Sequence, residues 1–324
     1  MKKINLGWGH SPAVRQAFID TYHGHTLGID AATLMSMDYP EHTGDPAIVE
    51  LTRKVIKRQV GQDYDYIVLT NGATGAIDIA LRAFEQRGYK NVITRKPPYY
   101  TRYPGVIQAA KMNHVFPAEK AYEKAVILLD MPSNPTGDID LISNDLITPL
   151  ILDAVYLNGV YSHNKLPVPP HDVLIGSYSK LLGINGIRIG WIATNSPYLY
   201  QKVKELATVE YCGISANDSI VLFNILRNFD WAKFEKRGRA NLDENRMVWQ
   251  QLEKYFEHLI TPIGMFHYTA IDKAMQKLLD KAEITYQKGS VLGTTDDFGR
   301  FNLGATNEML REAVKRILKI DHKK

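Results

Sequence analysis

The 324-residue sequence contains a single cysteine, Cys212, so it has no intramolecular disulfide and no cysteine-based metal cluster, and we predict no metal site. No apolar run approaches the length of a membrane-spanning helix, and residues 1–7 hold no apolar signal region. The formal net charge of +4 is spread along the chain and gives no nucleic-acid-binding signature. We therefore expect a cytoplasmic protein that binds neither membrane nor nucleic acid.

Two nucleotide-binding signatures are also missing. The sequence has no phosphate-loop pattern of nucleotide hydrolases, and the turn at residues 70–75 has no GxGxxG fingerprint. The composition is that of an ordinary globular protein, with 45% hydrophobic residues and enough length for one large domain and a smaller one. The sequence therefore predicts a large core and leaves the ligand to be identified from individual motifs.

Short apolar segments recur along the first two thirds of the chain, each followed by turn-forming residues. They lie at residues 66–69, 92–94, 125–129, 150–152 and 173–175. Helical or longer connections between such segments predict an α/β fold with a mostly parallel sheet flanked by helices. In these sheets ligands bind beyond the carboxyl ends of the strands, which is where the polar motifs described below occur.

The pattern changes after residue 230. A long, charged, amphipathic helix is predicted over residues 230–256, followed by strand-like pieces at 265–268 and 300–303 and a final helix over 307–320. We expect three parts from these patterns. They are an N-terminal segment (1–35) that packs with the small domain, a large ligand-binding domain (36–229) and a smaller α+β C-terminal domain (230–324).

The sequence Ser177-Tyr-Ser-Lys180 follows one of the apolar strands, and Arg188 lies eight residues after the lysine. A lysine amine can form a Schiff base with an aldehyde cofactor. An arginine and nearby hydroxyl groups can hold a phosphate. Taken alone, Lys180 could equally be a solvated loop lysine, so the other motifs decide between the two interpretations.

Asp153 ends an apolar strand, where a carboxylate needs a partner. It could pair with a protonated pyridine nitrogen, and Tyr156 could reach a phenolic oxygen on the same ring. Asn134, in the turn Asn134-Pro-Thr-Gly137, offers an amide donor to that oxygen, and Tyr100 could stack on the ring. A helix cap for Asp153, a plain turn at Asn134 and core packing of Tyr100 are the structural alternatives.

The turn Gly72-Ala73-Thr74 leads from a strand into a helix, so its backbone amides and the Thr74 hydroxyl can bind an anion. Alone this signal is weak, because small residues are common at such turns. Together, the amide site, aromatic ring, asparagine, carboxylate, tyrosine, lysine and arginine match one ligand, pyridoxal 5′-phosphate.

These motifs resemble those of the class I/II aminotransferases, which are fold-type I pyridoxal-phosphate enzymes. The pattern S-x-S-K-x-x-G-x-x-G-x-R-x-G begins at Ser177, and N-P-T-G and D-x-x-Y precede it in the family order. Asp153 follows Asn134 by 19 residues, and Lys180 follows Asp153 by 27. The resemblance implies a seven-stranded-type sheet and covers most of the chain.

The resemblance also assigns roles to residues. It makes Lys180 the Schiff-base lysine and proton carrier, Asp153 the pyridinium partner, and Tyr156 and Asn134 the phenolate partners. The cofactor-binding set that it implies is Tyr39, Gly72, Ala73, Thr74, Tyr100, Asn134, Asp153, Tyr156, Ser177, Ser179, Lys180 and Arg188. The substrate-binding set is Trp8, Gly9, Asn134 and Arg300, with Arg300 gripping the α-carboxylate. Tyr39 matches a tyrosine that reaches the phosphate of the neighbouring subunit, which implies a homodimer.

By this resemblance the protein moves an amino group between an amino acid or related amine and a 2-oxo acid in a ping-pong reaction. A lyase, decarboxylase or cyclase would use the same lysine and carboxylate, so the residues leave that alternative open. A non-catalytic cofactor-binding module is the third possibility. The sequence is short for the family, with no long N-terminal dimer arm and a small domain that looks trimmed, and these departures concern the substrate pocket more than the cofactor site.

Overall fold

The computed structural model describes residues 3–22, 40–118, 122–140, 147–256, 260–261 and 263–321. Its largest sheet has seven strands in the order β2-β8-β7-β6-β5-β3-β4. In that order the bounds are Tyr66–Thr70, Gly190–Thr194, Val173–Ser177, Leu150–Asp153, Ala125–Asp130, Asn91–Ile93 and Asn113–Val115. Only β8 runs antiparallel to its neighbours, β2 and β7. The predicted mostly parallel α/β sheet is therefore confirmed.

Helices cover both faces of this sheet because successive strand residues point to opposite sides. In β6, for example, Ile151 packs into one core, whereas Leu150 and Leu152 pack into the other. Helices α4 (Gly72–Glu85), α5 (Tyr103–Ala109) and α7 (Pro197–Tyr211) lie on the first side. The second side is covered by α3 (Pro46–Val60) and α8 (Ala216–Leu226). Both faces are thus buried, which explains why the central strands β5, β6 and β7 are apolar up to their last residues.

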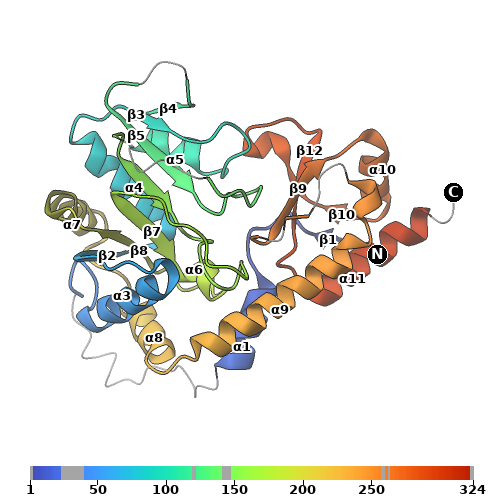
Figure 1. The fold of residues 1–324 in the computed structure, drawn as a ribbon, viewed down its shortest axis with the longest axis horizontal. Coiled ribbons are helices and arrows are strands. Elements are labelled where there is room, and N and C mark those ends of the chain that lie inside the picture. Colours follow the sequence, from blue (N-terminus) through green and yellow to red (C-terminus); the bar gives the residue numbers. More distant parts are fainter. Residues whose placement is uncertain are drawn as a thin grey trace.

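The C-terminal part builds a second, smaller sheet in the order β11-β12-β9, with β12 antiparallel to both neighbours. Figure 1 shows it to the right of the large sheet, with helix α9 running beneath. The elements here are α9 (Trp231–Gln250), η1 (Glu253–Tyr255), β9 (Phe266–Ala270), α10 (Lys273–Lys281), β10 (Ile284–Thr285), β11 (Gln287–Lys288), η2 (Gly289–Leu292), β12 (Phe298–Asn302) and α11 (Asn307–Asp321). The domain boundaries given above stay predictions.

The N-terminal segment lies with this C-terminal part. Strand β1 (Ile4–Asn5) pairs in parallel with β10, and α1 (Pro12–Thr21) lies along α9 (Figure 1). The Asn241 side chain fixes that contact by donating to the Ala13 carbonyl oxygen at 2.9 Å. Residues 3–21 therefore run past the space between the two sheets before they reach α9.

The predicted helix 230–256 is shorter than expected. Asp230 caps α9, but the α-helix ends at Gln250 and a short 3-10 helix follows. The ring of Phe256 stacks on that of Trp249 at 5.6 Å, so the chain turns back to bury this aromatic pair. Among the described residues, none of the helices combines the length and apolar character that a membrane crossing requires.

Candidate active site

Lys180 lies on α6 (Tyr178–Leu181), a single helical turn that follows β7 directly. The turn begins at Ser177, whose Oγ accepts a hydrogen bond from the Ser179 backbone amide at 3.2 Å. The Lys180 Nζ donates to the carbonyl oxygen of Gly9. Burial, and then the charges of Arg300 and Arg188, lower the pKa of Lys180 from 10.5 to about 8. The amine is therefore partly neutral near physiological pH, and the neutral form is the nucleophile and base.

Asp153 lies at the carboxyl end of β6, as its position after an apolar run predicted, and is buried. Its Oδ2 accepts from the Tyr103 hydroxyl at 3.0 Å, and its Oδ1 accepts from the Val155 amide at 3.2 Å. Burial, followed by the nearby charge of Asp130, raises the pKa of Asp153 from 3.8 to about 7. Because the ionised form is poorly stabilised here, a cationic ligand facing Asp153 would gain a strong partner.

The start of α4 offers backbone amides that can bind an anion. The Asn71 side chain, at the N-cap position, makes no capping hydrogen bond, so it leaves the first amides of α4 for other acceptors. Gly72 has a φ of +71°, and a Cβ atom there would lie 2.6 Å from Nη2 of Arg188. Only glycine lets the guanidinium approach this helix start so closely. Arg188 is held by Ser179, whose Oγ accepts from Nη1 at 3.0 Å.

Arg300 comes from β12 of the small sheet and is almost fully buried, at 3% exposure. Its Nη1 donates to Asn134 Oδ1 at 2.8 Å, and its Nη2 donates to the Gly7 carbonyl oxygen at 3.0 Å. The guanidinium also lies 4.2 Å above the ring of Phe266. Its Nε is buried without a hydrogen-bond partner in the described part of the chain, and burial lowers the pKa of Arg300. A buried cation of this kind is incomplete without an anionic ligand.

The N-terminal segment at residues 7–9 spans the two halves of the site. The Gly7 carbonyl oxygen accepts from Arg300 and the Gly9 carbonyl oxygen accepts from Lys180. The Trp8 side chain stays 59% exposed and lies edge-on to the His10 ring. Backbone oxygens, rather than the Trp8 ring, therefore make the inward contacts of this segment.

One cavity of about 910 Å³ joins these groups. The sequence-predicted residues that line it are Trp8, Gly9, Ala73, Thr74, Tyr100, Asn134, Asp153, Tyr156, Ser177, Ser179, Lys180, Arg188 and Arg300. Gly72 is not in the lining and acts through its contact with Arg188. Tyr39 lies outside the described residues. The structure thus brings the two predicted sets together into one space between the large and small sheets.

The cavity also holds residues that the sequence argument did not select, among them Asp130, Asn185, Thr285, Tyr286 and Gln287. Asp130 carries the same signal as Asp153, a carboxylate at the end of an apolar strand, and could have been found by it. The Asn185 Oδ1 is buried without a hydrogen-bond partner among the described residues. Residues 285–287 line the cavity beside the N-terminal segment because β10 pairs with β1, and no local sequence pattern predicts that pairing.

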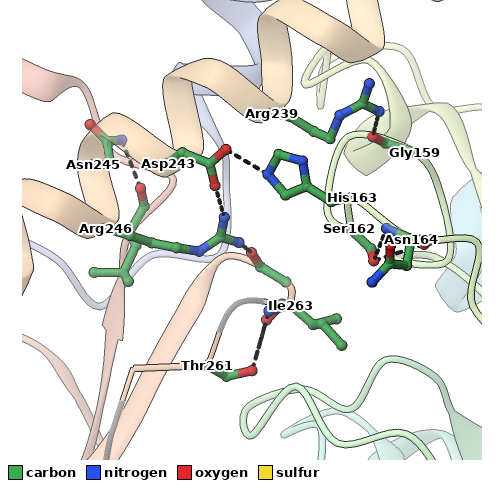
Figure 2. A network of polar contacts seen from close by, with 12 residues as sticks. Gly159, Ser162, His163, Asn164, Arg239, Asp243, Asn245, Arg246, Thr261 and Ile263 are labelled. Atoms are coloured by element: carbon green, nitrogen blue, oxygen red, sulfur yellow. Dashed lines mark hydrogen bonds and ion pairs between the residues drawn. The ribbon is translucent and has the colours of Figure 1, made fainter.

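A polar network supports the loop that follows Tyr156 (Figure 2). Figure 2 shows Asp243 of α9 between the His163 ring and the Arg246 guanidinium. Its Oδ2 lies 2.6 Å from His163 Nε2, and its Oδ1 lies 2.7 Å from Arg246 Nη1. Arg246 also donates to the Gly264 carbonyl oxygen at 2.6 Å. The Gly264 amide in turn donates to the carbonyl oxygen of Tyr161. The network therefore ties this loop both to α9 and to the segment that precedes β9.

The Tyr161 hydroxyl carries this support to the site, because it donates to the Lys180 carbonyl oxygen at 2.8 Å. The Tyr161 ring also meets the Tyr156 ring edge-on at 5.3 Å. Tyr156 itself is buried and lies edge-on to Phe266, the residue under Arg300. The loop thus positions Tyr156 between groups of both sheets.

Comparison with known proteins places this arrangement in a family. A family model described as aminotransferase class I and II matches residues 4–317. The chain belongs to the class I and II aminotransferases. The histidinol-phosphate aminotransferase of Methanocaldococcus jannaschii is 23% identical to it, over 97% of this chain and 85% of that protein. The aspartate aminotransferase of Pyrococcus horikoshii is also 23% identical, over 87% of this chain and 82% of that protein.

The fold agrees with this assignment. A double mutant of Thermus thermophilus aspartate aminotransferase has a TM-score of 0.80 to this aminotransferase, at 16% identity and with coverage of 98% of this chain and 91% of that chain. This likeness shows the common fold. The protein is therefore a pyridoxal-phosphate-dependent aminotransferase of fold type I, as its motifs led us to expect.

The residues of the cavity fit this cofactor. The aminotransferase has a buried amine of lowered pKa at Lys180, a carboxylate of raised pKa at Asp153 and a cradle of helix amides beside Arg188. These match an aldehyde, a basic ring nitrogen and a phosphate, which are the three reactive groups of pyridoxal phosphate. The Nε of Arg300 and the Oδ1 of Asn185, which have no hydrogen-bond partner among the described residues, are further polar atoms available for ligand contacts.

Proposed function

We propose that this aminotransferase moves an amino group between an amino acid or related amine and a 2-oxo acid, with Lys180 as the base and Arg300 as the carboxylate-binding group. One relative is named as a histidinol-phosphate aminotransferase and another as an aspartate aminotransferase, each at 23% identity. Those names support transamination as the reaction. The substrate's α-carboxylate is the part on which this chain's own residues bear most directly.

The observation that carries the proposal is the state of Arg300. Its guanidinium is buried and has only neutral acceptors, Asn134 Oδ1 and the Gly7 carbonyl oxygen, in the described residues. A guanidinium in this state gains most from a bidentate carboxylate, which supplies both the missing charge and the missing acceptor for Nε. Every amino acid and 2-oxo acid substrate carries such a carboxylate.

Lys180 serves as the base because burial keeps part of its amine neutral. When bound, pyridoxal phosphate withdraws the electrons of the bond broken at the substrate α-carbon. The Lys180 Nζ would take the proton from the substrate α-carbon and would deliver it to the cofactor carbon that carried the aldehyde. Its hydrogen bond to the Gly9 carbonyl oxygen keeps the amine in the cavity, beside the segment that covers the substrate.

The remaining residues hold the cofactor. We assign Asp153 to the ring nitrogen, Asn134 and Tyr156 to the phenolic oxygen, and Tyr100 to the ring face. The phosphate is assigned to Gly72, Ala73, Thr74, Ser177, Ser179 and Arg188. The support is that all but Gly72 line one cavity and that Gly72 makes room for the Arg188 guanidinium. Trp8 and Gly9 complete the proposed site from the N-terminal segment.

We further propose a cytoplasmic homodimer in which Tyr39 reaches the phosphate of the neighbouring subunit. This part rests on the sequence match at Tyr39 alone. Subunit mixing tests it, because a Lys180→Ala subunit and a Tyr39→Phe subunit would together form one intact site. Activity that appears on mixing two impaired variants supports the shared site. Unimpaired activity of Tyr39→Phe alone contradicts it.

The main test follows the visible absorbance of the loaded protein during addition of single amino acids. We expect the cofactor band to convert as one equivalent of 2-oxo acid is released, and a second 2-oxo acid to restore the band. Lys180→Ala should abolish both changes, while Lys54→Ala, at an exposed lysine, should leave them intact. Release of ammonia or carbon dioxide in place of the 2-oxo acid contradicts transamination.

A further inference from the structure

A second buried carboxylate lies beside Asp153. Asp130 is the last residue of β5, and the parallel ladder sets it directly opposite Asp153, the last residue of β6. Neighbouring strands lie about 4.8 Å apart, and residues in register point to the same face. Both carboxylates line the cavity, and Asp130 is only 4% exposed.

Asp130 is tied to the turn that carries Asn134. Its Oδ2 accepts from the Asn134 backbone amide at 2.6 Å. Arg95 stands on the other side, with Nε 3.5 Å from the Asp130 Oδ1 and with Nη2 donating to the Asp130 carbonyl oxygen at 3.2 Å. The 3.5 Å contact is an ion pair without a hydrogen bond, since Arg95 Nε has no hydrogen-bond partner among the described residues. Arg95 also pairs with Asp140, at 2.7 Å.

The two carboxylates interact electrostatically. After burial, the charge of Asp130 is the next cause that raises the pKa of Asp153. The pKa of Asp130 is itself raised by burial, against the opposing effects of Arg95 and the Asn134 amide. Two tyrosine hydroxyl groups lie nearby. Tyr103 donates a hydrogen bond to Asp153, and the charge of Asp153, after burial, helps to raise the pKa of Tyr100. Such a pair holds a proton, or another cation, more tightly than one carboxylate does.

We propose that Asp130, neutralised in part by Arg95, is a positioning residue that fixes the Asn134 turn and adds a second negative charge behind Asp153. A cationic ring nitrogen facing Asp153 is then attracted by both carboxylates. The same side chain sets Asn134, whose Oδ1 accepts from Arg300, so it couples cofactor binding to the carboxylate-binding group. This inference rests on the proposed function, because it assumes that Asp153 faces the ring nitrogen.

Two substitutions separate these roles. Asp130→Asn keeps the size of the side chain and an acceptor for the Asn134 amide, but removes the charge. Asp130→Ala removes both. Asp140→Asn is the matched control. Asp140 is also a carboxylate partner of Arg95, but it does not line the cavity.

The measurement is the equilibrium affinity of each purified apoprotein for pyridoxal phosphate and for its deaza analogue, in which C–H replaces the ring nitrogen. Asp130→Asn should weaken pyridoxal phosphate binding about tenfold and leave analogue binding unchanged, because only the first ligand has a nitrogen to protonate. The pH midpoint of the bound cofactor's visible band should fall in the same variant. Asp130→Ala should in addition raise the KM of the amino acid.

The outcomes are distinguishable. Equal pyridoxal phosphate affinity in the wild type and Asp130→Asn overturns this inference alone, and so does an equal loss for both ligands. An effect of Asp140→Asn as large as that of Asp130→Asn overturns the specific role of Asp130. A wild-type protein that does not bind pyridoxal phosphate overturns both this inference and the proposed function.

Discussion

The two sheets contribute opposite charges to one cavity, and they prepare those charges differently. The large sheet places Asp130 and Asp153 at strand ends, where hydroxyl, amide and guanidinium groups surround them. The small sheet places Arg300 in the middle of β12, where, among the described residues, two of its nitrogens have neutral acceptors and the third has none. The large-sheet side therefore favours a cationic ligand facing Asp153, whereas the small-sheet side favours an anionic ligand on Arg300.

The N-terminal segment at residues 7–9 contacts both sides, but a substrate competes with only one of its two contacts. The Gly9 carbonyl oxygen accepts from Lys180 and the Gly7 carbonyl oxygen accepts from Arg300. A substrate that supplies its own carboxylate to Arg300 competes with the second contact and adds the negative charge that a carbonyl oxygen lacks. The comparison predicts that changes on the small-sheet side affect substrate binding, and changes on the large-sheet side affect the cofactor.

The largest effect should come from Arg300→Gln. Removing one partner of a buried, charged hydrogen-bonded pair costs about 2–5 kcal/mol, so the KM of the amino acid should rise at least about thirtyfold. Pyridoxal phosphate affinity should change little, because the phosphate and ring contacts come from the large sheet. Steady-state kinetics and cofactor titration measure the two effects separately.

Arg311→Gln is the control for Arg300→Gln. Arg311 is an exposed arginine of α11 that pairs with Glu244, and its loss should leave the KM unchanged. A large loss of cofactor affinity in Arg300→Gln, with an unchanged KM, would reverse the division of labour between the sheets.

The cofactor side was the more predictable from sequence, and the reason is local. Asp153 is the last residue of its strand, and Lys180 and Asn134 lie in the short segments that follow theirs, so the strand positions also fix these residues at the sheet edge. The contacts of Gly7 and Gly9 are made by backbone oxygens, which carry no residue signature. The sequence predicted that α9 extends to residue 256, beyond its actual end at Gln250, because the packing of Trp249 on Phe256 depends on tertiary structure.

The large-sheet carboxylates should give the apoprotein an unusual pH dependence. In the unfolded chain Asp153 loses its proton near its ordinary pKa of 3.8, whereas in the folded chain it keeps the proton up to about pH 7. Between these values the folded state binds more protons, so the free energy of unfolding should fall as the pH rises and level off above about 7. Asp153→Asn should reduce this fall, leaving the part due to Asp130.

Urea unfolding of the apoprotein at pH 5 and pH 8 measures the effect. Wild type should lose more stability between these values than Asp153→Asn does, and loading with pyridoxal phosphate should shrink the difference, since the cofactor's cation favours the ionised carboxylate. An equal change in wild type and variant would show that Asp153 ionises as readily in the folded protein as in water.

The smallest effect should come from the network that joins the two sides. Asp243→Asn leaves the half-buried Arg246 with the Gly264 carbonyl oxygen and without its carboxylate, and it removes the partner of His163. Burial already lowers the pKa of Arg246, against the effect of Asp243, so the loss should cost about 1–3 kcal/mol of stability and a few degrees of Tm.

Glu244→Gln is the control. It changes the next residue of α9, removes only an exposed ion pair and should change the Tm by less than about one degree. Because the network reaches Lys180 and Tyr156 indirectly, through Tyr161, kcat should stay near that of wild type in both variants. A kcat that falls in Asp243→Asn while the Tm is unchanged would mean that the positions of Tyr156 and Lys180 depend more on the loop than on β6 and β7, the strands that precede them.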